Sequence, residues 1–293
     1  MEHILLGAPV AASIRQRSQD RAERLKSEGI TPLLAIVQAD DRPDTAKYAQ
    51  SLVKKAPESG VETRLVSFEG GVSAGTLGST LRELSANPSV HGILLLRPLP
   101  RGINEEEMCA LIAAEKDVDC ATDLSLAGVF SGKELGFAPA TAQAVMEILH
   151  YYGIAPEGKR AVIVGRSLVV GRPLAMMLLQ ENATVTLCHR STRDLPAVTK
   201  EADILVAAMG RLGAIGAEHV SEGQIIIDVG INWDPSVGKI RGDVMFDEAE
   251  KAAAAITPVP GGVGAVTTAV MLEHVTLAAE RLSGKDRQKG TET

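Results

Sequence analysis

Helical and strand-like patterns of apolar residues alternate along the chain. Apolar residues recur at helical spacing in one set of segments and form short continuous runs in another. The expected helices cover residues 9–27, 43–58, 74–86, 104–114, 141–152, 171–181, 194–200 and 265–282, and the expected strands cover 31–38, 61–68, 91–96, 160–165, 183–189, 202–210 and 224–230. This alternation predicts an α/β fold with parallel sheets. Because the strands are continuous apolar runs, we expect helices to cover both faces of the sheets.

The alternating elements form two series, and the length of 293 residues suits two domains. The second series begins near Gly158. We therefore expect one domain from residues 1–140 completed by the last helix, 265–283, and a second domain from residues 141–264. The polar tail, 284–293, is expected to be disordered.

Composition narrows the class of protein. The formal net charge of −7 argues against a nucleic-acid partner. The N-terminus does not have the pattern of a signal peptide, and no apolar run approaches the ~20 residues that span a membrane. The three cysteines are too few and too scattered for a disulfide framework or a zinc site: Cys109, Cys120 and Cys188. We expect a cytoplasmic protein with reduced thiols, no metal and no membrane partner.

A nucleotide site is predicted in the stretch GKRAVIVGRSLVVGRP. An expected strand leads into Gly165-Arg166-Ser167, and a helix opens at Gly171. Dinucleotide-binding folds place a glycine-containing turn at this point, because the backbone N–H groups and the helix N-terminus attract the pyrophosphate. The alternative is a tight turn that binds no ligand.

The end of the next strand indicates which dinucleotide binds. Folds that select NAD usually place an acidic residue there for the ribose 2′-hydroxyl. This chain has Arg190 instead, and Arg166 lies in the preceding turn, so two guanidinium groups could converge on a 2′-phosphate. The pattern favours NADP over NAD. The alternative is that Arg190 and the nearby Arg193 are solvated loop charges.

Two further stretches carry candidate chemistry. In TAKYAQSLVKKA, Tyr48 shares an expected helix with Lys54 and Lys55; at 100° per residue, Lys55 returns toward the side of Tyr48 and Lys54 does not. Both lysines could equally be ordinary surface residues. In ITPVPGGVG, prolines stiffen a backbone that glycines allow to approach a flat ligand closely, although a rigid interdomain turn would use the same residues.

Taken together, TPVPGGVG, GRSLVVGRP, KDVD, IIIDVGIN, GDV and the Tyr48 helix give a chain that resembles the bifunctional 5,10-methylenetetrahydrofolate dehydrogenase/cyclohydrolase family. The resemblance runs from about residue 4 to 283. It implies two α/β domains with a cleft between them, and a C-terminal domain that is Rossmann-like. It also implies a tetrahydrofolate substrate and a homodimer, and the cofactor expected from the arginine pattern is NADP.

The resemblance also implies roles for individual residues. Asp119 would hydrogen-bond the pterin ring and Tyr48 would pack against it, so these two are the expected catalytic residues. An isolated Asp is more commonly a loop or helix-cap carboxylate, which is the alternative for Asp119. The remaining substrate-binding residues would be Pro258, Pro260, Gly261 and Gly262, and the cofactor would contact Gly165, Arg166, Ser167 and Ile231, with Arg190 added from the charge pattern.

The chain departs from the family at two positions assigned to the cyclohydrolase step. Leu52 stands for a Lys four residues after the Tyr, and Leu96 stands for a Gln. We therefore expect a dehydrogenase whose cyclohydrolase activity is weak or lost. Alternatives are a bifunctional enzyme in which Lys55, Arg97 or water replaces the pair, and a non-catalytic folate- or nucleotide-binding protein. Side-chain alternation would place Arg97 on the strand face opposite Leu96. In a milder departure, Cys120 stands for a Gly.

Overall fold

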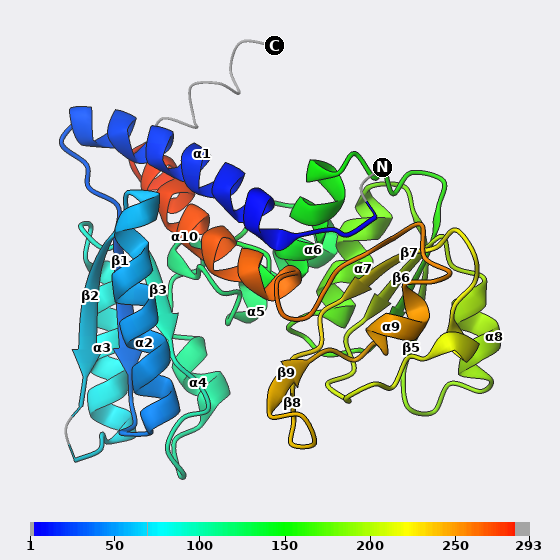
Figure 1. The fold of residues 1–293 in the computed structure, drawn as a ribbon. Helices are drawn as coiled ribbons and strands as arrows, with labels where there is room; N and C mark the ends of the chain where they lie inside the picture. Colours follow the sequence, from blue (N-terminus) through cyan, green and yellow to red (C-terminus); the bar gives the residue numbers. More distant parts are fainter. Residues whose placement is uncertain (1–2, 69, 285–293) are drawn as a thin grey trace. The chain divides into compact units, whose positions relative to one another are not determined.

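The computed structural model describes residues 3–68 and 70–284, and it divides into two compact α/β units (Figure 1). The three-stranded unit comprises Ser13–Ala138 and Thr268–Thr293, and the five-stranded unit comprises Met1–Ala12 and Pro139–Thr267. The predicted α/β class with parallel sheets is confirmed. Within the described part of the chain, no helix is long and apolar enough to cross a membrane.

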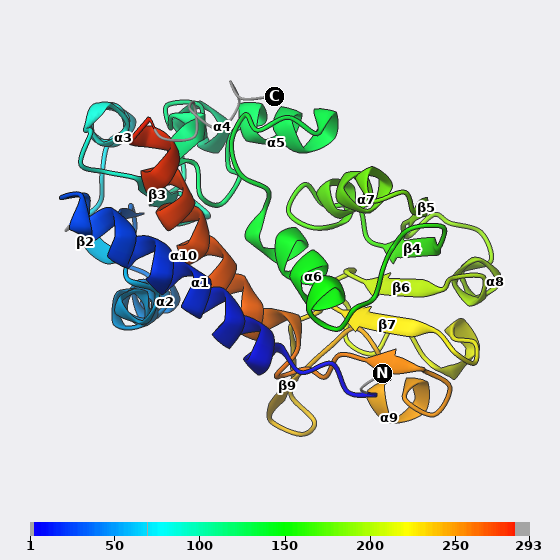
Figure 2. The same ribbon diagram turned by 90° about the horizontal axis from the view of Figure 1, so that it is seen from above.

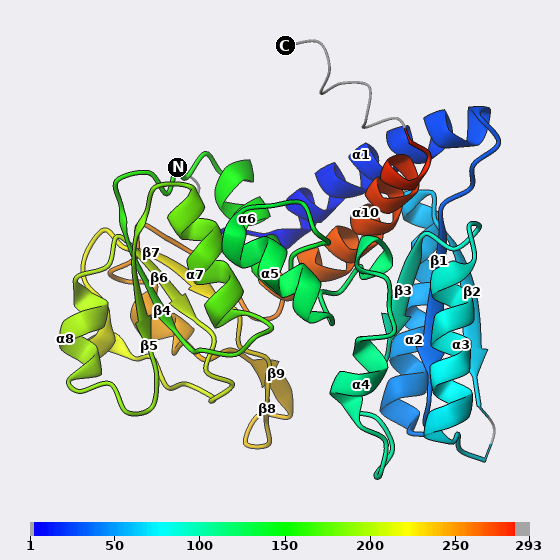
Figure 3. The same ribbon diagram turned by 180° about the vertical axis from the view of Figure 1, so that it is seen from behind.

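The sheet of the three-stranded unit has the order β2-β1-β3, and all its strands are parallel. The strands are β1 (Leu33–Gln38), β2 (Glu62–Ser67) and β3 (Gly92–Leu95). Helices α2 (Pro43–Lys55) and α3 (Ala74–Ala86) cover opposite faces: α2 lies in front of the sheet in Figure 1, and α3 lies in front in the reverse view of Figure 3. The α3 face has a continuous aliphatic core that includes Val37, Leu77, Leu81, Ile93 and Leu95.

The two longest helices, α1 (Gly7–Ser27) and α10 (Val263–Leu282), lie side by side (Figure 2). Within the three-stranded unit they are joined by ion pairs. Arg17 meets Glu273 at 3.0 Å, and Arg21 and Arg24 meet Glu280 at 3.1 and 3.0 Å. The C-terminal helix thus completes a unit made mostly of N-terminal sequence.

Two elements of this unit differ from the predictions. The helix expected over 104–114 is only α4 (Glu105–Cys109), followed by a separate 3₁₀ turn, η2 (Ala114–Lys116). Helix α5 (Asp123–Ser131) lies in a region expected to be loop. Its first turn is set by Asp117, a fully buried carboxylate that accepts hydrogen bonds from the backbone N–H and hydroxyl of Thr122 and from the hydroxyl of Ser125.

The sheet of the five-stranded unit has the order β10-β7-β6-β4-β5, again with all strands parallel. The strands are β4 (Arg160–Val164), β5 (Thr184–Cys188), β6 (Ile204–Ala207), β7 (Ile225–Asp228) and β10 (Ala255–Ile256). The helices are α6 (Ala140–Tyr151), α7 (Gly171–Gln180), α8 (Leu195–Lys200) and α9 (Phe246–Ala249). Helices α7 and α9 lie on opposite sides of the sheet, as Figures 1 and 3 show from the two directions.

The expectation that helices cover both faces of the sheets does not hold at one edge of each sheet, whereas the opposite edge strands, β3 and β10, are buried. Strands β2 and β5 each end their sheet, and most of their side chains are partly or fully exposed. Leu65 on β2 is 44% exposed and Leu187 on β5 is 36% exposed. Strand order decides which apolar run lies at an edge, and strand order is not visible in a run of residues.

Residues from the N-terminus also complete the five-stranded unit. Ile4 forms a parallel bridge to Ile256 in β10, where the N–H of Leu5 donates to the Ile256 carbonyl and the N–H of Ile256 donates to the His3 carbonyl, both at 2.8 Å. Each unit therefore combines two segments that lie far apart in the sequence.

Several short elements of the five-stranded unit were not predicted. Among them are the antiparallel hairpin of β8 (Asn232–Asp234) and β9 (Lys239–Arg241), helix α9 and strand β10. The last helix starts at Val263, two residues before the predicted start. The predicted disordered tail, 284–293, lies outside the described residues except for Gly284.

Candidate active site

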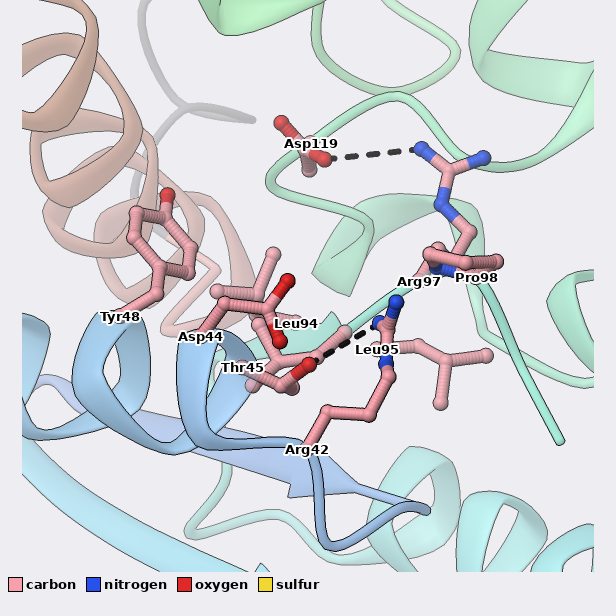
Figure 4. A pocket seen from close by; sticks show the side chains of 10 residues that line it. Arg42, Asp44, Thr45, Tyr48, Leu94, Leu95, Arg97, Pro98 and Asp119 are labelled. Atoms are coloured by element: carbon pink, nitrogen blue, oxygen red, sulfur yellow. Dashed lines mark hydrogen bonds and ion pairs between the residues drawn. The ribbon is translucent and has the colours of Figure 1, made fainter.

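A cavity of about 320 Å³ opens in the three-stranded unit beside α2 and the end of β3 (Figure 4). It is lined by Arg42, Asp44, Thr45, Tyr48, Leu94, Leu95, Leu96, Arg97, Pro98 and Asp119. The structure thus brings the two predicted catalytic residues, Tyr48 and Asp119, to one cavity.

Burial and charge perturb both of these groups. Burial and the charge of Asp119 raise the pKa of Tyr48 to about 12, so the phenol keeps its proton at neutral pH. Burial also raises the pKa of Asp119 to about 6, with a smaller upward contribution from Asp117 and an opposing one from Arg97. A carboxyl group that titrates near neutrality in a cavity is typical of a functional site.

Arg97 reaches the cavity from the turn after β3. It lines the same cavity as Leu96, and its guanidinium Nη2 lies 3.7 Å from Oδ2 of Asp119 (Figure 4). Leu94 and Leu95, which are consecutive in β3, also both line the cavity, so a shared lining does not decide on which face a side chain lies. The placement of Arg97 and Leu96 on opposite faces therefore stays a prediction.

The helix-cap role that was the alternative for Asp119 belongs to the nearby Asp117. Asp117 is the buried carboxylate at the start of α5, where it also accepts the N–H of Ala121 at 2.8 Å. Asp119 is partly exposed, with its side chain at 36%, and faces the cavity and Arg97. Directly after Asp119, Cys120 adopts a left-handed backbone with φ of 55°, a conformation that explains why glycine suits this position.

Leu52 and Leu96 occupy the two positions at which the resemblance implies polar side chains. Leu96 lines the cavity and is 6% exposed, whereas Leu52 is 1% exposed and is not among the lining residues. Lys54 and Lys55 are exposed and do not line the cavity either. Among the residues that line it, the charged ones are two arginines and two aspartates, with no lysine.

A second cavity, of about 310 Å³, lies in the five-stranded unit. The predicted substrate-binding residues Pro258, Pro260, Gly261 and Gly262 line it together with Ile231, which was predicted to contact the cofactor. The loop is held by the N–H of Gly7, which donates to the Gly261 carbonyl at 2.7 Å. The predicted substrate residues thus fall into two groups, one in each unit.

Two buried carboxylates, neither of them predicted from the sequence, support this second cavity. Asp228, at the end of β7, accepts the N–H groups of Gly230, Asp243 and Val244, and burial raises its pKa to about 6. Asp243 accepts three backbone N–H groups from Met209, Gly210 and Arg211 and the side-chain amide of Asn232, at 2.5 to 2.9 Å. The available signal was an Asp that ends an apolar strand and another inside GDV.

The predicted nucleotide turn lies where the sheet order reverses. From β4 the chain moves outward to β5 and then returns to β6 on the other side, and ligands of open α/β sheets bind at such a point beyond the strands' carboxyl ends. Gly165 follows β4 with φ of 138°, and a Cβ there would lie 2.0 Å from the Ala208 carbonyl oxygen. A Cβ on Gly171 would lie 1.9 Å from the carbonyl oxygen of Gly165.

The groups available to an anionic cofactor gather at this edge. Helix α7 starts at Gly171 without a side-chain cap. In its first turn Pro173 has no N–H, and the N–H groups of Arg172 and Leu174 donate to the carbonyls of Ser167 and Val170, so the N–H of Gly171 is the one that this turn offers to a ligand. Ser167 uses its hydroxyl to accept the N–H of Val170 at 3.1 Å. Arg166 and Arg190 are exposed and follow the neighbouring parallel strands β4 and β5. The residues present fit a dinucleotide that carries an additional phosphate.

Comparison with known proteins identifies the family. Residues 5–119 match the model of the tetrahydrofolate dehydrogenase/cyclohydrolase catalytic domain, and residues 139–283 match that of the NAD(P)-binding domain of the same family. The chain is 47% identical over 285 residues to the bifunctional protein FolD of Carboxydothermus hydrogenoformans, covering 97% of this chain and 99% of that protein.

Solved structures give the same result. The bifunctional FolD enzyme of Campylobacter jejuni superimposes with a TM-score of 0.91 at 39% identity, covering 95% of this chain and 98% of that one. The Trypanosoma brucei dehydrogenase-cyclohydrolase, complexed with NADP and an inhibitor, superimposes with a TM-score of 0.87 at 33% identity, covering 95% of this chain and 97% of that one. The chain therefore belongs to the tetrahydrofolate dehydrogenase/cyclohydrolase family.

Proposed function

We propose that this protein oxidises 5,10-methylenetetrahydrofolate to 5,10-methenyltetrahydrofolate with NADP, and that its cyclohydrolase activity is weak or absent. The observation that carries the proposal is the cavity of the three-stranded unit. It combines Tyr48 and Asp119 with an apolar wall at Leu96 and has no lysine in its lining.

The dehydrogenase step makes modest chemical demands on the protein. The C–H bond of the methylene carbon between N5 and N10 breaks, and the hydride leaves with its electron pair, which bound NADP accepts at the nicotinamide. The resulting cation is stabilised by its own two nitrogens, so no base has to remove a proton. The chain's contribution is positioning: Asp119 accepts hydrogen bonds from the pterin and the Tyr48 ring packs against it.

Cofactor binding would use the edge of the five-stranded sheet. Gly165, Ser167 and the N-terminus of α7 would hold the pyrophosphate, Arg166 and Arg190 the 2′-phosphate, and Ile231 would contact the cofactor beside the Pro258–Gly262 loop. Exposed guanidinium groups after both β4 and β5 support NADP over NAD.

The cyclohydrolase step demands more. Water adds to the methenyl carbon and a proton must be removed, after which the bond from that carbon to N5 breaks. Leu96 supplies neither an acceptor nor a donor for this proton, and Leu52 is buried away from the lining. Replacing both polar partners also avoids leaving a buried Gln unsatisfied, which would cost about 1–3 kcal/mol.

A paired assay tests the proposal. Purified protein is given methylenetetrahydrofolate with NADP or NAD, and methenyltetrahydrofolate is then supplied alone while its absorbance is followed. We expect rapid reduction of NADP, slower reduction of NAD, and decay of the methenyl compound close to the uncatalysed rate. The double variant Leu52→Lys/Leu96→Gln should gain hydrolysis, whereas Leu52→Met/Leu96→Met, a volume-conserving control, should not.

Two alternatives give different results in the same assay. A fully bifunctional enzyme is favoured by the position of Arg97, which lines the cavity beside Leu96 and could orient a water molecule. It predicts hydrolysis by the unmodified protein that Arg97→Leu abolishes. A non-catalytic folate- or nucleotide-binding protein predicts binding of both ligands with no formation of NADPH.

We also propose a cytoplasmic homodimer. Strand β5 presents an unpaired edge in the described chain, with Leu187 on the strand and the 54% exposed Leu179 on the adjacent α7. Pairing of two such edges would bury these side chains. The three cysteines are free and buried, in keeping with reduced thiols. Sedimentation velocity would test the assembly, and Leu187→Lys should shift a β5-paired dimer to monomer.

A further inference from the structure

Arg97 belongs to a chain of charged groups at the edge of the active-site cavity. Its Nη1 lies 3.8 Å from Glu105 in α4, and its Nη2 lies 3.7 Å from Asp119. Glu105 also accepts the backbone N–H of Leu99 at 3.2 Å, which ties the turn after β3 to α4. The side chain of Arg97 is 30% exposed, so it is held between two carboxylates within a partly desolvated site.

Apart from Arg97, the charged group that acts on Asp119 opposes its ionisation. Asp117 precedes it on the same loop and raises its pKa. Tyr48 and Asp44 of α2 also line the cavity, and Tyr48 is neutral at physiological pH. Arg42, which precedes α2, is paired with Asp40. Arg97 is the group that lowers the pKa of Asp119 against the effect of burial.

We propose that Arg97 is a positioning residue for substrate binding, which keeps Asp119 as a carboxylate aimed at the pterin ring. This inference rests on the proposed function, in which Asp119 binds the pterin. The N3–H and 2-amino groups of a pterin are both donors, and a carboxylate accepts two such hydrogen bonds at once. A protonated Asp119 would present an O–H to a donor and lose one of the two bonds.

The effect depends on pH in a defined direction. Asp119 titrates at about 6 in the presence of Arg97. An opposite charge this close lowers a carboxyl pKa by about 1–3 units, and the partial exposure of Arg97 places its effect near the lower end, about 1 unit. Without Arg97, the pKa of Asp119 would rise by about this amount. The ionised fraction at pH 6.5 then falls about threefold, whereas at pH 8 it changes by about a tenth.

The test compares Arg97→Leu and Arg97→Lys with the unmodified protein, using Arg101→Leu, an exposed arginine in the next turn, as the matched control. The rate of NADP reduction gives kcat/KM for methylenetetrahydrofolate between pH 5.5 and 8.5. In Arg97→Leu we expect the acidic limb of the pH profile of kcat/KM to move up by about one pH unit. KM at pH 6.5 should rise about threefold with kcat nearly unchanged, and Arg97→Lys should restore the original limb.

Carbon-13 NMR titration of the Asp119 carboxyl gives a readout that does not require turnover. A raised Asp119 pKa in Arg97→Leu together with the shifted limb supports the inference. A loss that is equal at every pH, or a limb that does not move, overturns it and leaves Arg97 with a purely structural role. If the unmodified protein reduces no NADP while the NMR shift is present, the proposed function fails and the electrostatic link between Arg97 and Asp119 stands.

Discussion

The substitution Asp243→Asn tests whether one buried carboxylate holds the loops around the second cavity. Asp243 is fully buried and accepts four hydrogen bonds, two at each oxygen. Three of the donors lie in the loop after β6 and the fourth is Asn232 in the hairpin strand β8. Asn has the same shape, but one of its two terminal atoms is an NH₂ group, so whichever way it turns, two donors face another donor.

The magnitude follows from those two lost bonds. An unsatisfied buried donor costs about 1–3 kcal/mol, and bonds to a charged acceptor lie toward the upper end. Residues 209–211 are partly exposed, so water compensates in part. We therefore expect Asp243→Asn to lower the free energy of unfolding by about 2–3 kcal/mol. Because Ile231 precedes Asn232, KM for NADP should rise more than kcat falls.

Urea unfolding followed by far-UV circular dichroism would measure the change, and hydrogen exchange would locate it. The amides of residues 209–211 should exchange faster in Asp243→Asn than in the unmodified protein. Asp247→Asn is the matched control, since its side chain is 89% exposed and its ion pair with Arg241 spans 4.0 Å. The reasoning is refuted if the two variants differ by less than about 0.5 kcal/mol, or if those amides keep their protection.

Two further predictions concern the nucleotide turn and the pH dependence of stability. Gly165→Ala places a Cβ 2.0 Å from the Ala208 carbonyl oxygen at a residue whose φ is 138°. The affinity for NADP and the Tm should both fall, and the free energy of unfolding should fall by more than about 2 kcal/mol. The control Gly158→Ala also has a positive φ of 71° but nothing within 4 Å, and should cost about 1 kcal/mol; equal effects would contradict the steric argument. Asp119 titrates at about 6 in the folded protein against 3.8 for the free side chain, so the folded state binds its proton more tightly. The unmodified protein should therefore lose stability as pH rises from 4 to 6. At pH 7.5, Asp119→Asn should be more stable than the unmodified protein by about 1 kcal/mol, a value reduced to allow for the partial exposure of the side chain. At pH 4 it should be no more stable, and thermal melts at both pH values would measure the difference.

The parallel sheets and most helices could be predicted because their signals are local. The helix over 74–86 has the predicted bounds, with Ser73 accepting the N–H of Thr76 at its start. Helix α5 could not be predicted in the same way. Its sequence DLSLAGVFS is short and contains glycine and serine, and its first turn depends on the buried Asp117. The β8–β9 hairpin has strands of three residues each and is attached through Asn232 to Asp243, a contact that no local pattern reveals.

The site shows the same division between local and long-range information. Motifs indicated Tyr48, Asp119 and Pro258–Gly262, and the structure places each beside a cavity. The contact of Arg97 with Asp119 joins the turn after β3 to a separate loop, and no local pattern reveals it. Asp228 and Asp243 were missed because their importance comes from the backbone groups that they join across fifteen or more residues.

The pairing of segments far apart in the sequence bears on the order in which the protein folds during synthesis. Synthesis proceeds from the N-terminus, and domains of many proteins fold as they emerge from the ribosome. Here Leu5 has no β-sheet partner until Ile256 has been translated, and Arg17 and Arg21 have no helix to meet until α10 follows. These pairings therefore form late in synthesis, after the residues between the two partners have left the ribosome.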